Sequence, residues 1–145
     1  MEIKIMQLEH GVNLPLPSYH SQQASGMDLS AAVEDSILIA PGEIRLIPTA
    51  LIVAIPNGFE GQIRPRSGLA VKYGITIVNA PGTIDSDYRG EIKVGLINLS
   101  GQAFTVQRGM RIAQLVIAPV ARVIWQLTVS RDPTARGDGG FGHTG

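Results

Sequence analysis

Cysteine is missing from this 145-residue chain, and its absence excludes several kinds of site at once. Without cysteine there is no disulfide framework, no thiolate nucleophile and no cysteine zinc site. The three histidines, His10, His20 and His143, are scattered along the chain and show no metal-ligand spacing. Neither thiol chemistry nor a zinc centre is therefore expected.

A surplus of either charge is also missing, because 12 basic residues balance 12 acidic ones and the formal net charge is zero. A protein that binds nucleic acid over a broad face usually carries a basic surplus. We therefore expect no nucleic acid among the partners, although charge can still be concentrated locally.

Long apolar runs are absent too. None approaches the roughly 18 apolar residues of a membrane span. The first ten residues, MEIKIMQLEH, carry acids and lack the apolar core of a signal peptide. We therefore expect a cytoplasmic protein with no membrane contact.

The chain does have many short apolar segments, separated by some of its 17 glycines and 9 prolines about every eight to twelve residues. This pattern predicts one all-β domain, a sandwich or a barrel. The expected strands cover residues 2–6, 36–40, 44–48, 51–55, 59–64, 75–78, 91–98, 104–106, 111–120 and 122–129.

Residues 67–73 are the one segment that favours a helix, with Ser67 able to cap its start and Gly74 able to end it. Helix N-termini present unpaired N–H groups that suit phosphate, and the preceding Arg66 offers planar donors. The alternative is that Ser67 only caps the helix and Arg66 is an ordinary surface side chain. The segment is not a Walker loop, because it lacks the Gly-Lys-Ser/Thr ending.

Residues 79–98, NAPGTIDSDYRGEIKVGLIN, predict the turn and second strand of a β-hairpin. The turn holds two acids, an arginine and Tyr88, which is more than a solubilising loop needs, and loops on rigid strands often carry function. We interpret it as a hairpin that presents one poised carboxylate. An ordinary hydrated hairpin tip is the alternative.

Two further polar residues stand out. Asp28 is expected on a turn within residues 25–29, and Gln114 is a lone amide among apolar neighbours in residues 111–119. A buried amide without hydrogen bonds costs about 1–3 kcal/mol. Gln114 should therefore bond either to backbone or to a ligand and its metal-bound waters.

The C-terminal residues 131–145 show no apolar periodicity and are rich in glycine, so we expect them to be mobile when nothing is bound. Glycine lets backbone approach a ligand, Arg136 can clamp phosphate oxygens, and Phe141 can stack on a base. A disordered terminus is the alternative.

Taken together, these segments resemble the trimeric deoxyuridine triphosphatases (dUTPases). Five ordered blocks that span the chain carry the resemblance: residues 24–31, 65–70, 79–93, 111–115 and 136–145. The last block departs from many members, which have serine where this chain has His143. The resemblance implies an all-β, jelly-roll-like subunit of the β-clip type with one short helix, assembled as a homotrimer whose three sites each draw on all three chains. It divides the chain into a β-clip domain (1–135) and a flexible glycine-rich lid (136–145).

The implied activity is Mg²⁺-assisted hydrolysis of dUTP to dUMP and pyrophosphate, which keeps uracil out of DNA and supplies dUMP for thymidylate synthesis. Asp85 would activate the attacking water, and Tyr88 would lie under the deoxyribose. Asp28 and Gln114 would bond waters around a magnesium ion that the triphosphate chelates, and Arg111 would orient a neighbouring carboxylate. The other implied substrate contacts are Arg66, Ser67 and Gly68 for the phosphates, Asn79, Gly82, Thr83 and Ile84 for uracil, Lys93 on the returning strand, and Arg136, Phe141, Gly142 and Thr144 in the lid.

Two alternatives stay open. A dCTP deaminase shares the implied fold but needs a glutamate that acts on the base, and Glu91 is the only glutamate near the hairpin turn. A catalytically silent trimer that binds nucleotide or a regulatory protein is the other. Pyrophosphate release from dUTP, tested against dCTP and dTTP, separates all three.

Overall fold

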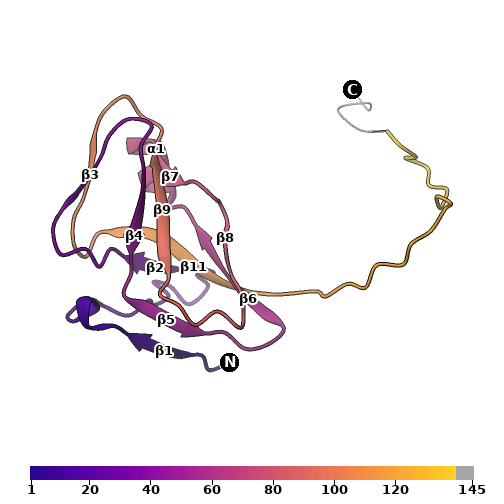
Figure 1. The fold of residues 1–145 in the computed structure, drawn as a ribbon, viewed down its shortest axis with the longest axis horizontal. Coiled ribbons are helices and arrows are strands. Elements are labelled where there is room, and N and C mark those ends of the chain that lie inside the picture. The colour runs from indigo at the N-terminus through magenta and orange to yellow at the C-terminus, as the bar shows by residue number, and fades with distance from the viewer. Residues whose placement is uncertain (140–145) are drawn as a thin grey trace.

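The computed structural model of this chain describes residues 1–139, which form a β-rich body with a C-terminal segment extending from it (Figure 1). Its strands are β1 (Lys4–Gln7), β2 (Met27–Ser30), β3 (Ile37–Ile39), β4 (Ile44–Pro48), β5 (Leu51–Ala54), β6 (Phe59–Arg64), β7 (Ile75–Ile77), β8 (Gly82–Ile84), β9 (Lys93–Asn98), β10 (Phe104–Val106) and β11 (Arg111–Pro119). A 3-10 turn (Glu9–Gly11) and one α-helix, α1 (Ser67–Tyr73), complete the regular structure of this part of the chain. The expected all-β class with one short helix is confirmed.

The strands form four antiparallel sheets, of which two are larger. One has the order β2-β11-β6-β8 and the other β4-β9-β7, while β1 pairs with β5 and β10 with β3. Most strands lie within a residue or two of their expected bounds. Where apolar residues alternate, as on β5 and β9, the alternation fixes which face is buried. On β9 and just before it, Ile92, Val94 and Leu96 are at most 1% exposed, as their alternation predicts.

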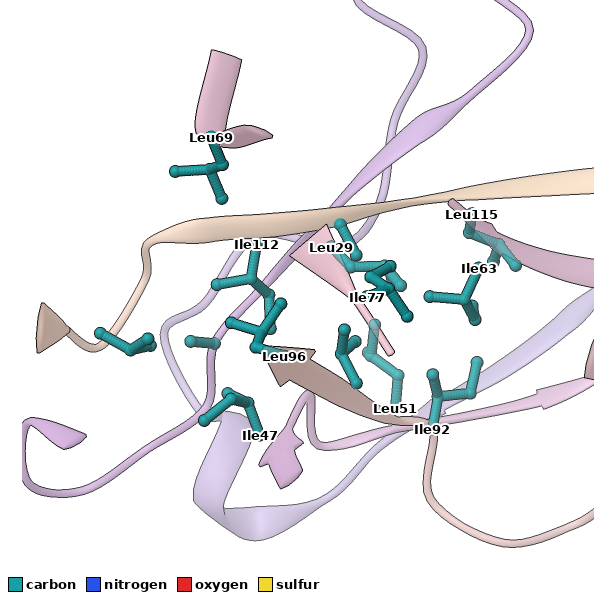
Figure 2. Packing of buried hydrophobic residues seen from close by; sticks show 14 of the residues in the cluster. Leu29, Ile47, Leu51, Ile63, Leu69, Ile77, Ile92, Leu96, Ile112 and Leu115 are labelled. Carbon is teal, nitrogen blue, oxygen red and sulfur yellow. The ribbon is translucent and has the colours of Figure 1, made fainter. Parts of the chain in front are cut away.

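One core lies between the sheets and draws on almost every element (Figure 2). It is built of isoleucine, leucine and valine, and β-branched side chains pack well on a pleated surface. The largest fully buried side chains include Leu29, Ile39, Ile47, Ile55, Ile75, Ile92, Leu96 and Ile112. This packing makes the strands a rigid frame for the loops between them.

The expected hairpin exists, since β7 pairs with β9, but its connection is more than a turn. Within it, Gly82–Ile84 forms β8 and pairs with β6 of the other large sheet, a strand that the sequence pattern did not predict. A three-residue strand that begins with glycine is too short to show a period of two. The connection therefore bridges both large sheets.

Three local expectations were wrong. Asp28 lies on β2, paired with Gln114 of β11, and not on a turn. Ser67 does not cap α1, because the N-cap is Arg66 and no side chain caps it, although Gly74 ends the helix in the left-handed conformation as expected. Residues 122–129 form no strand. No segment of residues 1–139 pairs with them, and the chain there is extended and exposed.

Among the described residues, no helix combines the length and apolar character that a membrane crossing requires.

Candidate active site

A pocket of about 410 Å³ lies where the β7–β9 connection runs between the two large sheets. All seven hairpin residues that the sequence singled out as substrate contacts line it, namely Asn79, Gly82, Thr83, Ile84, Asp85, Tyr88 and Lys93. Its remaining walls are mostly apolar and come from β4, β6, β7, β9 and the two residues before β9. The pocket thus combines apolar side chains with convergent polar groups, and placed polar groups give a small-molecule site its specificity.

Asp85 follows directly after β8, and its side chain is exposed to solvent. Tyr88 is held across the turn, because its hydroxyl donates a hydrogen bond to the backbone carbonyl of Glu91 at 2.9 Å. This bond holds the ring at the pocket wall, where the residue stays 43% exposed. The pocket thus combines a carboxylate able to bind water with an aromatic wall.

Asn79 sits where two glycines leave room for its side chain. A Cβ atom on Gly82 would lie 3.3 Å from the Asn79 amide nitrogen, and one on Gly95 would lie 3.2 Å from Val78 Cγ1 and 3.9 Å from the Asn79 oxygen. Glycine inside a strand often marks such a close approach. The Asn79 amide is therefore set at the pocket wall with its nitrogen and oxygen facing different strands, which suits the edge of a planar base.

Sequence reasoning missed several of the residues that line the pocket. Leu46 lies opposite Gly95 in the β4–β9 register, and both line the pocket. The glycine within the otherwise alternating residues 92–98 was a usable signal for a close approach. No comparable signal marked Leu46, because a strand residue reaches a pocket through sheet pairing that the local sequence does not show.

A second polar cluster surrounds Asp28 on β2. One carboxylate oxygen accepts from Arg66 Nε at 3.1 Å and Gln114 Nε2 at 3.2 Å. The other lies 3.2 Å from Arg111 Nη1 and 3.1 Å from His20 Nε2. Gln114 therefore does have the partner that its position required, and Arg111 does contact a carboxylate. His20 is a member that sequence reasoning missed.

The Asp28 side chain is only 7% exposed, so burial by itself raises the pKa of its carboxyl group. The charge of Arg66, the Gln114 hydrogen bond, and the charges of Arg111 and His20 outweigh burial and hold that pKa below its usual value. The ionised carboxylate therefore fixes the Arg66 side chain, which also donates to the Arg111 carbonyl at 3.2 Å.

A folded-state pKa below that of the unfolded chain gives stability that is present near neutral pH and lost on acidification. We expect Asp28→Asn to lower the free energy of unfolding at pH 7 by about 1–3 kcal/mol, because two guanidinium groups lose their counter-charge. Between about pH 5 and pH 3 the stability of this variant should fall less steeply than that of the wild type. Urea denaturation across this range measures both effects.

The matched control is Asp35→Asn, at an exposed aspartate whose side chain makes no hydrogen bond within the described part of the chain. It should unfold as the wild type does. An Asp28→Asn variant with wild-type stability and the same acid profile would contradict the assigned role.

Among residues 1–139 of one chain, the two clusters do not line a common pocket. Arg66, Ser67 and Gly68 lie at the start of α1, and neither they nor Gln114 are among the residues that line the Asp85 pocket. Arg136 is exposed, and among residues 1–139 its side chain bonds locally, to the Gly139 carbonyl at 3.0 Å. The lid residues Phe141, Gly142 and Thr144 lie outside the described residues.

Comparisons with known proteins agree on one family. The family model described as dUTPase matches residues 12–145. A deoxyuridine 5'-triphosphate nucleotidohydrolase of Wolbachia pipientis subsp. Culex pipiens is 56% identical over 147 residues, covering 100% of this chain and 96% of the relative. Its counterpart in Rickettsia felis is 56% identical over 144 residues, covering 99% of this chain and 97% of the relative.

Solved structures show the same fold at lower identity. A mutant dUTPase of Staphylococcus bacteriophage 80alpha, solved with dUpNHpp, has a TM-score of 0.88 at 23% identity and covers 99% of this chain and 98% of its own. The dUTPase of phage phi11 of S. aureus, solved as a mutant with a structural Mg(II) ion, has a TM-score of 0.82 at 21% identity, with 92% and 100% covered. These likenesses bear on the fold alone and confirm the expected subunit architecture. The family model and the curated relatives establish that the chain belongs to the dUTPase family.

Proposed function

We propose that this chain hydrolyses dUTP to dUMP and pyrophosphate in a site that copies of the chain share within a homotrimer. The observation that carries the proposal is the single pocket that gathers Asn79, Asp85, Tyr88 and Lys93 in a chain of the dUTPase family. Such a reaction removes dUTP before DNA synthesis can use it and supplies dUMP.

Recognition of the base rests on Asn79 and on the backbone of β8. The Asn79 amide has one donor and one acceptor end, which can pair with the alternating carbonyl and N–H groups of a uracil edge. Ile63, Ile77 and Ile84 give the pocket bulky apolar walls. These side chains are proposed to exclude the methyl group of thymine and the amino group that cytosine carries in place of a uracil carbonyl. Tyr88 forms the floor under the sugar.

Asp85 is the proposed catalytic base. Its carboxylate holds a water molecule and takes a proton as the water oxygen bonds to the α-phosphorus. The bond from that phosphorus to the bridging oxygen of the β-phosphate breaks, and pyrophosphate leaves. Because aspartate is a weak base, much of the rate must come from positioning the water and neutralising the phosphate charge.

Magnesium is the proposed cofactor. Among residues 1–139 no three His, Cys, Asp or Glu side chains gather to hold a metal directly. Within the same residues the Gln114 amide bonds through its nitrogen, which leaves its oxygen for a water. This donor set fits a hydrated ion, since magnesium keeps several waters. When bound to the triphosphate the ion neutralises charge, and Asp28 and Gln114 are proposed to contact it through water.

Two features of the single chain support a site that is shared between copies. The phosphate-binding candidates Arg66, Ser67 and Gly68 lie outside the Asp85 pocket of their own chain. The extended segment after β11 leaves Ile124 99%, Trp125 90% and Leu127 97% exposed. Apolar side chains so exposed are typical of an interface that is bare in the isolated subunit. We therefore place Arg66 of one copy beside Asp85 of another.

The segment after Ala135 is proposed to be a lid that closes over bound nucleotide. It would bring Arg136 and Thr144 to the γ-phosphate and Phe141 and Gly142 to the base. Closure would exclude all water except the nucleophile. In this division residues 1–135 form the β-clip domain and residues 136–145 the lid.

The deaminase alternative gains no support from Glu91. Although this glutamate is among the residues lining the pocket, its side chain is 14% exposed, and one carboxylate oxygen is bonded to His10 and to the Ala50 N–H. A carboxylate held in this way is already engaged by groups of the protein. Pyrophosphate released from dUTP, and not from dCTP or dTTP, is the result that tests the proposed function.

Removing the tyrosine ring should open the sugar pocket. We expect Tyr88→Ala to lower the ratio of kcat/KM for dUTP over UTP by about tenfold or more, because the wall that excludes a 2′-hydroxyl is lost. Steady-state kinetics with both nucleotides measures the ratio. Tyr19→Ala, at an exposed tyrosine that does not line the pocket, is the control. Unchanged discrimination in Tyr88→Ala would place the sugar gate elsewhere.

A further inference from the structure

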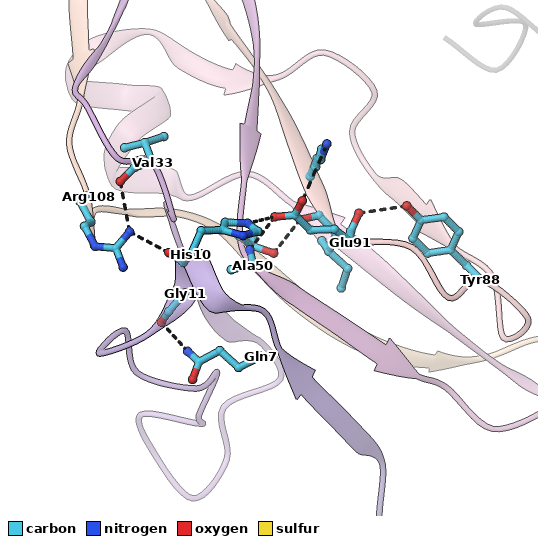
Figure 3. A network of polar contacts seen from close by, with 11 residues as sticks. Gln7, His10, Gly11, Val33, Ala50, Tyr88, Glu91 and Arg108 are labelled. Carbon is cyan, nitrogen blue, oxygen red and sulfur yellow. Dashed lines mark hydrogen bonds and ion pairs between the residues drawn. The ribbon is translucent and has the colours of Figure 1, made fainter.

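Glu91 occupies the centre of a polar network that joins the N-terminal segment to the pocket (Figure 3). One of its carboxylate oxygens accepts from His10 Nε2 at 2.8 Å and from the Ala50 backbone N–H at 2.8 Å. The second oxygen lies 3.8 Å from Lys93 Nζ. Groups from three separate parts of the chain thus converge on one side chain.

Glu91 also provides the hydrogen-bond acceptor for the Tyr88 hydroxyl. The Tyr88 hydroxyl donates to the Glu91 backbone carbonyl at 2.9 Å, so the position of the ring depends on where the Glu91 backbone is held. The backbone is in turn tied down by the carboxylate contacts on the other side of the residue (Figure 3). A residue that is hydrogen-bonded through both its backbone carbonyl and its carboxylate has little freedom to shift.

Gly90 makes room for this arrangement. A Cβ atom at position 90 would lie within 2.9 Å of Tyr88 Cε2 and would overlap the hydroxyl. Real Cβ atoms do not approach so closely, so any larger residue must push the ring or the turn aside. The ring therefore lies against the backbone of the turn, with its hydroxyl directed at the Glu91 carbonyl.

The contact between Glu91 and Ala50 also involves an unusual backbone conformation. Ala50 has a φ of 58°, in the left-handed region that residues with a Cβ rarely adopt. Its N–H bond to Glu91 helps to hold that conformation between β4 and β5. Burial raises the Glu91 pKa, while His10, the Ala50 N–H and Lys93 outweigh burial and lower it, so the group stays ionised and able to accept.

We propose that Glu91 is a positioning residue for sugar selection, which fixes Tyr88 through its backbone carbonyl and Lys93 through its carboxylate, with His10 and Ala50 as its anchors. This inference rests on the proposed function, because it assigns a second layer of residues to the same dUTP pocket. The N-terminal segment, which contributes no residue to the pocket wall, thereby influences which nucleotide the pocket accepts.

The test compares dUTP and UTP kinetics in Glu91→Ala and Glu91→Gln. In Glu91→Ala the buried Ala50 N–H and His10 lose their acceptor, and we expect KM for dUTP to rise about tenfold, with a smaller change in kcat. The kcat/KM ratio of dUTP over UTP should fall by about the same factor. Glu91→Gln keeps an amide oxygen that can accept from both anchors, so its ratio should stay within about threefold of the wild type.

Two further variants separate positioning from general stability. Glu43→Ala removes a carboxylate that likewise accepts a backbone N–H, from Ala40 at 2.8 Å, and pairs with Arg45, but does not line the pocket. It should leave the dUTP/UTP ratio unchanged. Tyr88→Phe removes only the hydroxyl, and we expect it to lower the ratio in the wild type and to add nothing in Glu91→Ala.

The outcomes are distinguishable. A wild-type chain that does not turn over dUTP overturns the proposed function and this inference with it. Wild-type turnover together with an unchanged dUTP/UTP ratio in Glu91→Ala overturns the inference alone. Additive losses from Tyr88→Phe and Glu91→Ala also overturn it, because they would show that the two residues act independently.

Discussion

Replacing Asp85 with asparagine should lower kcat for dUTP by about a thousandfold while leaving nucleotide affinity nearly unchanged. The amide keeps the size and polarity of the side chain but cannot take a proton from the attacking water. Asp85 is exposed at the end of β8, so its removal should not disturb the core. Pyrophosphate release at saturating dUTP and magnesium measures kcat, and calorimetric titration with dUpNHpp measures affinity.

The matched control is Asp87→Asn, two residues further along the same turn. Asp87 is exposed like Asp85 but does not line the pocket that contains Asn79. Its kcat should stay within about threefold of the wild type, since neither charge nor shape changes at the proposed reaction centre. Equal losses in the two variants would show that the charge of the whole turn matters and not one poised carboxylate.

Truncation after Ala135 should lower kcat/KM for dUTP by about a hundredfold or more while the oligomeric state stays the same. The missing residues 136–145 include the arginine and the aromatic ring proposed to close over the nucleotide. The exposed apolar segment that contains Trp125 remains in the shortened chain, and so does its proposed interface. Kinetics and analytical ultracentrifugation on one preparation separate the two expectations.

A single substitution, Arg136→Ala, helps to interpret the truncation. It removes the proposed phosphate clamp and keeps the length of the chain. We expect it to account for part of the loss, about tenfold, because the rest of the lid can still exclude water. A truncated chain as active as the full one would show that the site works without a lid.

Local sequence patterns were sufficient to predict a strand where one face of that strand is buried. The alternation of Ile92, Val94 and Leu96 predicted strand β9 because a shift of one residue would turn every apolar side chain outward. Residues 122–129 show a similar apolar content but pair with nothing among residues 1–139. Apolar character alone does not say whether the partner lies in the same chain, and here this made the prediction wrong.

The sequence indicated which hairpin residues line the candidate site, but not how these residues are arranged in space. The hairpin residues from Asn79 to Lys93 are close in sequence, so a short connection between paired strands had to bring them together. Pairing across sheets determines the rest. Leu46 reaches the pocket through β4, and Asp28 meets Gln114 through the β2–β11 register, neither of which follows from local sequence.

Asp85 of one copy and Arg66 of another are proposed to serve the same catalytic site. The most direct measurement is dUTP hydrolysis by mixed oligomers, purified after co-expression of Asp85→Asn with Arg66→Ala. Each variant alone should be nearly inactive. With random mixing, about a quarter of the sites would combine an intact Asp85 with an intact Arg66, and the mixture should recover about that fraction of wild-type activity. Activity no greater than the sum of the separate variants, in oligomers shown to be mixed, would mean that Asp85 and Arg66 of different copies do not meet in one site.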